Sequence, residues 1–518
     1  KALATMETLE RHRGHFYNWY DTQSLKPLPP LYISSVDSGN LAGHLLTLRP
    51  GLLGLADHKI LGPRWFEGLN DTFGILAEAA AAAKEVCDPT PIARLQQEME
   101  SATRSNPTTL GALRQCLDRL AAAAASVDDG AEAGEADPGN QLRWWTRAFA
   151  GQCRDALDEL ALLAPWTGRW SSRDRLTYVP DLDEIPTLRE LATLDVKVLP
   201  AIQQKANTAV PFEESARLEE LQRLITEAGR HARERIAAIE QLALKCGVLT
   251  RMEVDFLFDE QRHLLAIGYN VGECRRDPSY YDLLASEARF SSFVAIAQGQ
   301  LPQESWFALG RLLTIAGGEP ILLSWSGSMF EYLMPLLVMP SYEHTLLDQS
   351  CQAAVARQID YGKKRGVPWG ISECGYNAID VNLNYQYRAF GVPGLGLKRG
   401  LAEDLVIAPY AAALALLVAP KEACLNLQRL AAAVRSFMAH HQGMSLLSMA
   451  HLLLDRPMQK RFESEPIFQA TLLLLQERIP KATAFYAHTT GLSEHHLASS
   501  TPETPIRVFA NPDTSNPE

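Results

Sequence analysis

Three glutamates in this chain lie in contexts rich in aromatic residues or glycine. They are Glu287 in SEAR, Glu331 in MFEY and Glu373 in SECGY. Cleavage or transfer of a glycosidic bond needs two carboxyl groups flanking the bond. One donates a proton, and the other acts as a nucleophile or as a base for water. A single glutamate in a helical protein is usually a solvated surface residue, so it is the clustering with tyrosine and tryptophan that indicates a site.

Residues 361–399 form a long polar and aromatic segment around Glu373. Glycine and proline recur through it, so most of it is predicted to lie outside helix interiors. Ordering such a loop costs backbone entropy. Aromatic faces stack on sugar rings, and carboxylates and amides bind sugar hydroxyls, so the segment predicts a carbohydrate-active site. A tyrosine-rich loop packed for structure is the alternative. The aromatic and polar members are Trp369, Tyr376, Asn377, Asp380, Asn382, Asn384, Tyr385, Tyr387 and Phe390.

A second aromatic and polar segment covers residues 15–45. Four aromatic residues occur in the five positions from Phe16 to Tyr20, and they cannot all face one core, so some are predicted to line a cleft. Residues 32–36 are strand-like, and the following Asp-Ser-Gly-Asn run predicts a turn and a helix cap for Leu41 onward. Asp37 or Ser38 is thus either that cap or a ligand contact.

The rest of the chain is predicted to be mainly helical scaffold. Residues 1–14 read as a helix that ends at Gly14, and a long amphipathic helix is predicted for residues 212–246, with its RHARER run as a solvated face. A β-hairpin is predicted for residues 252–271. Further helices are expected up to about Gln298 and from Phe437 onward. A buried apolar helix is expected for residues 401–420, kinked or started at Pro409.

Bulk composition excludes several classes of function. The formal net charge of −12 over 518 residues argues against a nucleic-acid binder. The eight cysteines form no CxxC pair, which favours reduced thiols over a disulfide framework. The longest apolar run, residues 411–419, is far shorter than the roughly 20 residues of a membrane helix, and no signal peptide is evident, so a soluble chain is expected. The start at Lys1 suggests processing or a piece of a larger protein.

Neither a metal nor a nucleotide site is predicted. His440 and His441 are adjacent, so their side chains diverge on a helix and cannot chelate one metal as an i, i+4 pair would. A substrate hydrogen bond or a satisfied core histidine is expected instead. The run at residues 391–398, GVPGLGLK, lacks the GK[ST] ending of a phosphate loop. We expect no cofactor and no metal.

Several motifs together resemble the glucoamylase-like domain of bacterial cyclic β-1,2-glucan synthases. They are HFYNWYDT with VDSGNLAGHL, YDLLASEARF, WSGSMFEYLMP, VPWGISECGYN with YQYRAFGVPGLGLKRG, and FMAHHQGMS, which run from about residue 14 to residue 450. The resemblance implies an (α/α)6 barrel and an anomer-retaining transglycosylase that closes linear β-1,2-glucan into a ring. It also implies adjoining glucosyltransferase and phosphorylase-like domains, at the cytoplasmic side of the inner membrane.

The resemblance also assigns roles. Glu373 in the ISE motif matches the nucleophile and Glu287 in the SEAR motif matches the general acid/base, with Glu331 in reserve. The expected substrate contacts are Trp19, Tyr20, Asp21, Asp37, Asn40, Arg289, Trp325, Glu331, Trp369, Tyr376, Tyr385, Tyr387, His440 and Gln442.

The resulting expectation is a mainly α chain with short β-hairpins. Residues 1–65 carry the aromatic segment, 66–247 form a helical N-terminal region with an acidic loop near 127–141, 248–498 form the (α/α)6 barrel, and 499–518 are a loose tail. The alternatives are an endo-β-1,2-glucanase, which would share every motif, and a non-catalytic glucan-binding domain.

Overall fold

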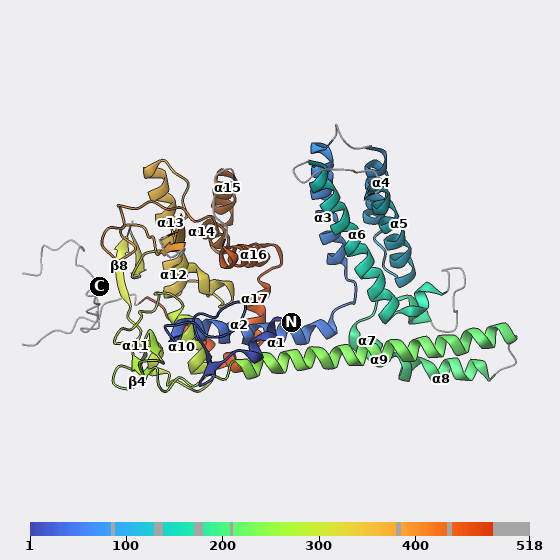
Figure 1. Cartoon of the computed structure of the whole chain (residues 1–518), viewed down its shortest axis with the longest axis horizontal. Helices are drawn as coiled ribbons and strands as arrows, with labels where there is room; N and C mark the ends of the chain where they lie inside the picture. Colours follow the sequence, from blue (N-terminus) through green and yellow to red (C-terminus); the bar gives the residue numbers. More distant parts are fainter. Residues whose placement is uncertain are drawn as a thin grey trace, which may run out of the picture. The chain divides into compact units, whose positions relative to one another are not determined.

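The computed structural model describes residues 1–83, 89–128, 138–169, 180–207, 211–316, 318–379, 385–431 and 438–479 (Figure 1). Most of the acidic segment near 127–141 and the whole tail at 499–518 lie outside these residues. The chain divides into two compact units, Lys1–Gly51 with Ala243–Glu518 as unit 1 and Leu52–Leu242 as unit 2. The prediction of a mainly α protein is confirmed.

Unit 2 is built from amphipathic helices, as its sequence predicts. Its helical elements are η1 (Leu55–Asp57), α3 (Pro63–Ala82), α4 (Pro89–Ser105), α5 (Leu110–Asp128), α6 (Pro138–Leu163), η2 (Pro165–Gly168), η3 (Pro180–Asp183), α7 (Leu188–Ala192), α8 (Leu194–Ala206) and the part of α9 (Phe212–Leu249) up to Leu242. Along α9, Leu218, Leu221, Ile225 and Ala232 recur at helical spacing and are fully buried. Burial of this stripe against α5 and α6 forms one core of the unit.

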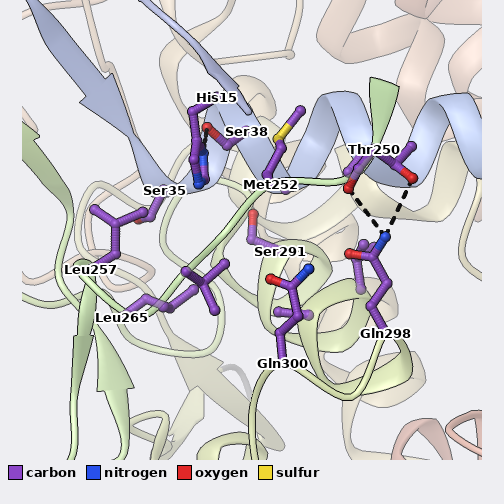
Figure 2. A pocket seen from close by; sticks show the side chains of 15 residues that line it. His15, Ser35, Ser38, Thr250, Met252, Leu257, Leu265, Ser291, Gln298 and Gln300 are labelled. Carbon is purple, nitrogen blue, oxygen red and sulfur yellow. Dashed lines mark hydrogen bonds between the residues drawn. The ribbon is translucent and has the colours of Figure 1, made fainter. Parts of the chain in front are cut away.

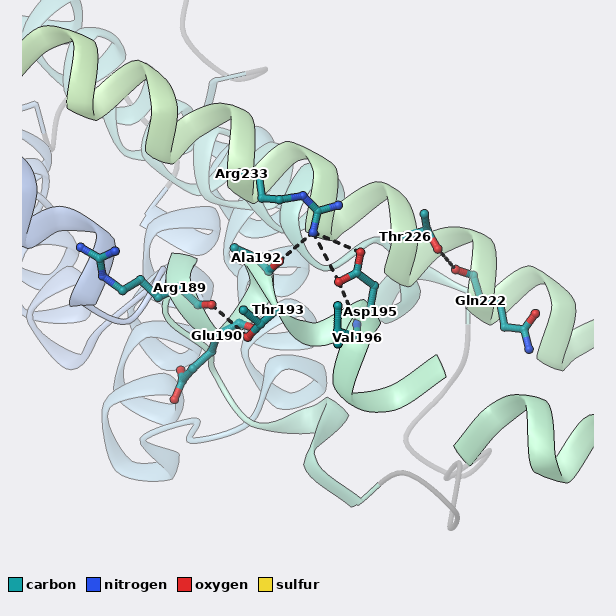
Figure 3. Close-up of polar contacts among 9 residues, drawn as sticks. All are labelled: Arg189, Glu190, Ala192, Thr193, Asp195, Val196, Gln222, Thr226 and Arg233. Carbon is teal, nitrogen blue, oxygen red and sulfur yellow. Dashed lines mark hydrogen bonds and ion pairs between the residues drawn. The ribbon is translucent and has the colours of Figure 1, made fainter. Parts of the chain in front are cut away.

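The arginine run of α9 does more than face solvent. Arg233 donates to the carbonyl oxygen of Ala192 at 2.7 Å and pairs with Asp195 at 3.1 Å, so it fixes the junction of α7 and α8 against α9 (Figure 3). Arg235 pairs with Glu159 of α6. The prediction of a solvated face holds for Arg233, which is exposed and still makes these contacts. Arg235 is half-buried, because α6 supplies an acceptor that the sequence does not reveal.

Unit 1 contains short antiparallel pairings and the remaining helices. The strands are β1 (Arg11–His12) with β2 (His15–Phe16), β3 (Tyr32–Ser34) with β6 (Gly268–Asn270) and β7 (Arg275–Arg276), β4 (Phe258–Asp259) with β5 (Leu264–Leu265), β8 (Leu312–Ala316) with β9 (Glu319–Leu323), and β10 (Cys374–Ile379) with β11 (Tyr385–Arg388). The helical elements are α1 (Ala2–Thr8), α2 (Ser35–Gly54), α10 (Ala288–Ala297), α11 (Glu304–Ala308), α12 (Met329–Leu333), η4 (Met334–Leu337), α13 (Leu346–Arg365), α14 (Pro409–Leu414), η5 (Ala415–Leu417), α15 (Pro420–Leu430), α16 (Ala439–Leu453), α17 (Pro457–Ser464), α18 (Pro466–Gln469) and η6 (Leu472–Gln476).

Two predicted boundaries are wrong. The first helix ends at Thr8, because Leu9 takes an extended conformation; Arg13 and Gly14, which take positive φ, then turn the chain between β1 and β2. Helix α2 begins at Ser35, so residues 37–40 lie in its first turns rather than in a turn before it. The hairpin predicted for residues 252–271 is confirmed in part: β4 pairs with β5, whereas residues 268–270 form β6, which pairs with β3 and β7 instead. The apolar helix predicted for residues 401–420 starts at Pro409 as α14 and η5, and residues 401–408 are not helical.

Helix α2 packs on α10 through two glycines. A Cβ on Gly39 would lie 2.3 Å from Cβ of Ser291, and one on Gly43 would lie 2.2 Å from Cζ of Phe290. Ser291 Oγ donates to the carbonyl oxygen of Val36 at 3.1 Å. Only glycine permits this approach, which brings the first turns of α2 beside the start of α10.

The glycine-rich run at residues 391–396 likewise allows a close backbone approach. A Cβ on Gly391 would lie 1.7 Å from the carbonyl oxygen of Ser326, and Val392 N donates to Gly327 O at 3.2 Å. The run therefore packs against residues 324–327. This packing explains why glycines occur at positions that superficially suggest a phosphate loop. Among the described helices, none combines the length and apolar character that a membrane crossing requires.

The α2–α10 contact predicts opposite effects for two glycine substitutions in one helix. Gly43→Ala should destabilise unit 1 by about 1–3 kcal/mol, because the new methyl group collides with the buried ring of Phe290. Gly54→Ala in the same helix has no atom within 4 Å of the new Cβ and should be neutral or stabilise by up to about 1 kcal/mol. Chemical denaturation of the two variants measures the difference, and equal effects would contradict the packing argument.

Candidate active site

Glu287 lies immediately before α10, at the end of a tight turn. Asp282 Oδ1 accepts the N–H groups of Leu284 and Ala285 at 2.8 Å each, and this turn leads into α10. Ser286 Oγ donates to Glu287 Oε2, and Asn40 Nδ2 lies 3.5 Å from Oε1. Asn40, predicted to contact substrate, thus contacts the carboxyl group of Glu287.

The surroundings of Glu287 disfavour its negative charge. The side chain is buried, and burial raises its pKa from 4.5 to about 7, with a further contribution from the charge of Asp37 on α2. The hydrogen bond from Ser286 acts in the opposite direction. A carboxyl group that keeps its proton near neutral pH is suited to protonate a leaving oxygen.

Glu373 is held at the edge of α12 and α14 by its neighbours in the chain. Gln358 of α13 donates to Ile371 O at 2.8 Å and accepts from Ile371 N at 2.9 Å. Ser372 Oγ accepts from Phe330 N at 2.9 Å and lies 2.8 Å from the hydroxyl of Tyr410. These contacts fix the backbone on the N-terminal side of Glu373, just before β10.

The pKa of Glu373 is raised as well, from 4.5 to about 8. Burial is the largest cause, followed by the charges of Glu331 and Glu287. The hydroxyl of Tyr387, 3.4 Å from Oε2, and the ammonium group of Lys398 act in the opposite direction. Because the charge of Glu287 raises the pKa of Glu373, the structure brings the two predicted catalytic carboxyl groups into one electrostatic environment. Such a pair retains a proton at neutral pH and can supply both an acid and a base.

Glu331 is placed differently. It occupies the third position of α12 in a capping box with Ser328. Its carboxylate accepts the hydroxyl groups of Ser324 and Ser326 at 2.6 Å each and that of Ser328 at 3.1 Å, along with the N–H groups of Ser326 at 3.1 Å and Ser328 at 2.9 Å. These five hydrogen bonds indicate a structural carboxylate, so the substrate contact expected of Glu331 stays a prediction.

Arg289 also serves the framework. It is 2% exposed, and its two terminal nitrogens donate to the carbonyl oxygens of Glu331 and Tyr332 at 2.6 Å each. Arg289 therefore joins α10, which follows Glu287, to α12. A substrate contact from this side chain would require breaking these buried bonds.

The aromatic residues predicted to line a cleft fall into two groups. Trp19 and Trp325 are 49% and 44% exposed, and Tyr387 is also exposed, so these three faces are accessible for stacking. Trp369 is buried, and its backbone N–H and carbonyl bond to Asn426, which places it in the core. Tyr376 and Tyr385 belong to β10 and β11, but their side chains lie outside the described residues.

The N-terminal segment is anchored to the start of α2. His15 Nε2 donates to Glu253 O at 2.6 Å, so the neutral ring accepts the hydroxyl of Ser38 at Nδ1, 2.8 Å away. Burial lowers the pKa of His15 to about 4, in agreement with a neutral ring. Figure 2 shows this pair at the wall of a pocket that none of the three glutamates lines.

The polar groups of this segment are used locally. Tyr20 Oη donates to Glu10 O at 2.7 Å, and Asp21 Oδ1 accepts the N–H groups of Gln23 and Ser24. Asn18 Nδ2 donates to Asp37 at 3.4 Å, which ties the segment to the exposed carboxylate whose charge raises the pKa of Glu287. Of the predicted contacts here, Asp37 therefore lies near Glu287, whereas Tyr20 and Asp21 shape the loop.

Helix α16 contributes histidines. The ring of His441 stacks on Tyr410 at 4.0 Å, and Tyr387 lies 6.0 Å from His440 and 6.4 Å from His441. His440 and Gln442 are exposed, whereas His441 is buried and was not among the predicted site residues. The adjacent histidines in the sequence indicate that one of them can reach the site, but the sequence does not show which ring faces inward.

Tyr281 is a second residue that sequence reasoning missed. Burial and the charges of Glu287, Asp37 and Glu373 raise its pKa, so its phenol lies among the carboxyl groups of the site. It immediately precedes the turn that presents Glu287, and the Tyr-Tyr-Asp run there was the only hint. Within the described ranges, no group of three or more His, Cys, Asp or Glu residues could hold a metal ion.

Comparisons with known proteins agree with the sequence motifs. Residues 279–445, which include all three glutamates, match the Glycoamylase family model, described as putative glucoamylase. The chain is 34% identical over 515 residues to the cyclic beta-(1,2)-glucan synthase NdvB of Rhizobium meliloti (strain 1021), an alignment that covers 93% of this chain and 16% of that protein. The predicted resemblance to the glucoamylase-like domain of these synthases is therefore confirmed. This chain spans only 16% of its relative's length.

Solved structures also show similarity to this chain. One of them is the endo-beta-1,2-glucanase from Talaromyces funiculosus in complex with sophorose, with a TM-score of 0.37 and 13% sequence identity, over 70% of this chain and 77% of that chain.

The raised pKa of Glu373 predicts a pH-dependent stability effect. The pKa of Glu373 is raised from 4.5 to about 8 in the folded protein, so the protonated form stabilises the fold. This contribution is fully present at a pH below 4.5 and is lost as the pH rises through 8. Glu373→Gln should therefore raise Tm relative to wild type by at least about 2 °C more at pH 9 than at pH 5. Thermal unfolding of Glu403→Gln, at an exposed position, is the control, and a pH-independent difference for Glu373→Gln would contradict the prediction.

Glu331 should behave as a structural residue in the same assay. Glu331→Gln places an amide donor among five serine donors and should lower the free energy of unfolding by at least about 2 kcal/mol at pH 7. Glu373→Gln should cause no such loss at that pH. Denaturant titration of both variants tests the distinction, and an unchanged stability of Glu331→Gln would remove the structural role.

Proposed function

We propose that this chain is an anomer-retaining transglycosylase that closes linear β-1,2-glucan into cyclic β-1,2-glucan. The observation that carries the proposal is the pair Glu287 and Glu373, two buried or half-buried carboxyl groups with raised pKa values in one environment. The likeness to a protein named cyclic beta-(1,2)-glucan synthase supplies the substrate class. The chain spans only 16% of that relative, so the relative's name does not by itself assign ring closure to this chain. Ring closure is therefore a proposal for this chain.

The proposed first step forms a glucosyl-enzyme. A carboxylate oxygen of Glu373 attacks the anomeric carbon, the bond to the glycosidic oxygen breaks, and Glu287 gives its proton to that oxygen. For Glu373 to attack, it must be ionised. Lys398 and the hydroxyl of Tyr387 favour that form, and they oppose the burial and neighbouring charges that raise its pKa.

The proposed second step transfers the glucosyl group. The 2-hydroxyl at the non-reducing end of the same chain attacks the anomeric carbon, Glu287 takes its proton, and the bond to Glu373 breaks. Transfer requires that a sugar hydroxyl replace water, which exposed aromatic faces such as Trp19 and Trp325 would favour by holding the acceptor.

The architecture that we propose is an (α/α)6 barrel within residues 248–498, supplemented by residues 1–65. The helical region at 66–247 and the tail complete the chain. We further propose that the chain works beside glucosyltransferase and phosphorylase-like domains of a longer protein at the cytoplasmic side of the inner membrane.

Product analysis tests the function. Linear β-1,2-glucan incubated with the 518-residue chain should yield products one water lighter than linear chains, detected by mass spectrometry. Glu287→Gln and Glu373→Gln should each lower the rate by at least about 100-fold. Exclusively linear products would indicate an endo-β-1,2-glucanase, and binding without products would indicate a non-catalytic domain.

Azide separates the two roles. In Glu373→Gly, azide should attack the substrate directly and give the inverted α-glucosyl azide. In Glu287→Ala, azide should attack the glucosyl-enzyme and give the β-glucosyl azide. Exchange of these outcomes would reverse the assignment of nucleophile and acid/base.

A further inference from the structure

The backbone in front of Glu287 adopts a conformation that is uncommon for a residue with a side chain. Ser286 has φ of 51°, in the left-handed region. Such conformations persist where the surroundings hold them. Here the Asp282 carboxylate binds two N–H groups of the turn, and Ala288 N donates to Ala285 O at 3.2 Å. The turn is thus fixed on both sides of Ser286.

The side chain of Ser286 contacts the carboxyl group that follows it. Its hydroxyl donates to Oε2 of Glu287, while the Asn40 amide lies 3.5 Å from Oε1. Glu287 makes no side-chain hydrogen bond to cap α10, so its carboxyl group is held by these neutral donors instead. One donor comes from the turn and the other from α2.

We infer that Ser286 is a positioning residue for Glu287, whose left-handed backbone sets where Glu287 leaves the turn and whose hydroxyl holds one carboxyl oxygen in place. The inference rests on the proposed function for its catalytic meaning, because it assigns Ser286 to the orientation and protonation of the proposed acid/base. Nothing in the sequence motif alone separates this serine from a solvated turn residue.

The charged groups that face Glu287 show why a neutral donor matters. Asp37 approaches from α2, Glu373 from the segment before β10, and the phenol of Tyr281 from the preceding turn. The charge of Asp37 opposes a negative charge on Glu287, and the charge of Glu287 in turn raises the pKa of Glu373. The Ser286 hydroxyl favours that charge, which Glu287 must carry when it accepts a proton from the incoming sugar hydroxyl. Loss of the hydroxyl should therefore raise the pKa of Glu287 above about 7.

Three substitutions separate the hydroxyl from the backbone. Ser286→Ala removes the hydroxyl and keeps the Cβ. Ser286→Gly removes the hydroxyl and relieves the left-handed backbone. Ser286→Thr keeps a hydroxyl but adds a β-branch that is unfavourable at positive φ.

The direct measurement is an infrared titration of the carboxyl stretch, with Glu287→Gln subtracted to isolate Glu287. The pH of half-ionisation should rise by about 1 unit in both the Ala and the Gly variants, and stay within about 0.3 units of wild type in the Thr variant. Tm should instead depend on how well each residue tolerates positive φ, so it should be highest for the Gly variant, lower for Ala and lowest for Thr. On linear β-1,2-glucan, the basic limb of kcat/KM against pH should shift upward with the infrared value.

An unchanged ionisation pH in Ser286→Ala and Ser286→Gly would overturn the inference, even if Tm fell, because only a structural role would then remain. If the wild-type chain turned over no glucan, the proposed function would fail, while the infrared titration would still decide the role of Ser286. If one variant did not fold, the other two would suffice.

Discussion

The site depends on how α12, a helix of five residues, is held in the core. The Glu331 carboxylate accepts hydrogen bonds from the serines of residues 324–328, and these bonds fix the start of this helix. Arg289 donates hydrogen bonds to the carbonyl oxygens of Glu331 and Tyr332, and Phe330 N donates to Ser372 Oγ. One short helix thereby sets the positions of α10 and of residue 372. The neighbours of these two elements are Glu287 and Glu373, the proposed catalytic pair.

A second consequence of this arrangement is electrostatic. Burial removes water from Glu287 and Glu373, and neighbouring carboxylates add to the cost of a charge on either, so both pKa values move toward neutrality. Small neutral donors and one lysine moderate the effect. Glu331 is a carboxylate of the same cluster with a different use, since its five hydrogen bonds satisfy the charge within the framework. Identical side chains thus take different roles according to the donors that surround them.

The N-terminal segment completes the site because two glycines let α2 approach α10. Gly39 and Gly43 remove the atoms that would separate the helices, which places Asn40 and Asp37 beside Glu287. Sequence reasoning expected these two polar residues at the site, but as a turn in contact with substrate. It could not show that the same residues lie in a helix, where Asn40 contacts Glu287 and the charge of Asp37 raises the pKa of Glu287, because that depends on a partner some 250 positions away in the chain.

The sequence by itself determined the mainly helical class, the β4–β5 pair within residues 252–271, the amphipathic helix predicted at 212–246, and the carboxylates, aromatic segments and family resemblance of the candidate site. These features follow from local periodicity and from residue types that carry their own chemistry. Only the tertiary structure decided that Trp369 and Arg289 are buried, that Glu331 is saturated with donors, and that Ser286, Tyr281 and His441 stand at the site. Burial, hydrogen-bond partners and pKa shifts arise from segments distant in sequence that meet in space, and no local pattern encodes which donor will reach which oxygen.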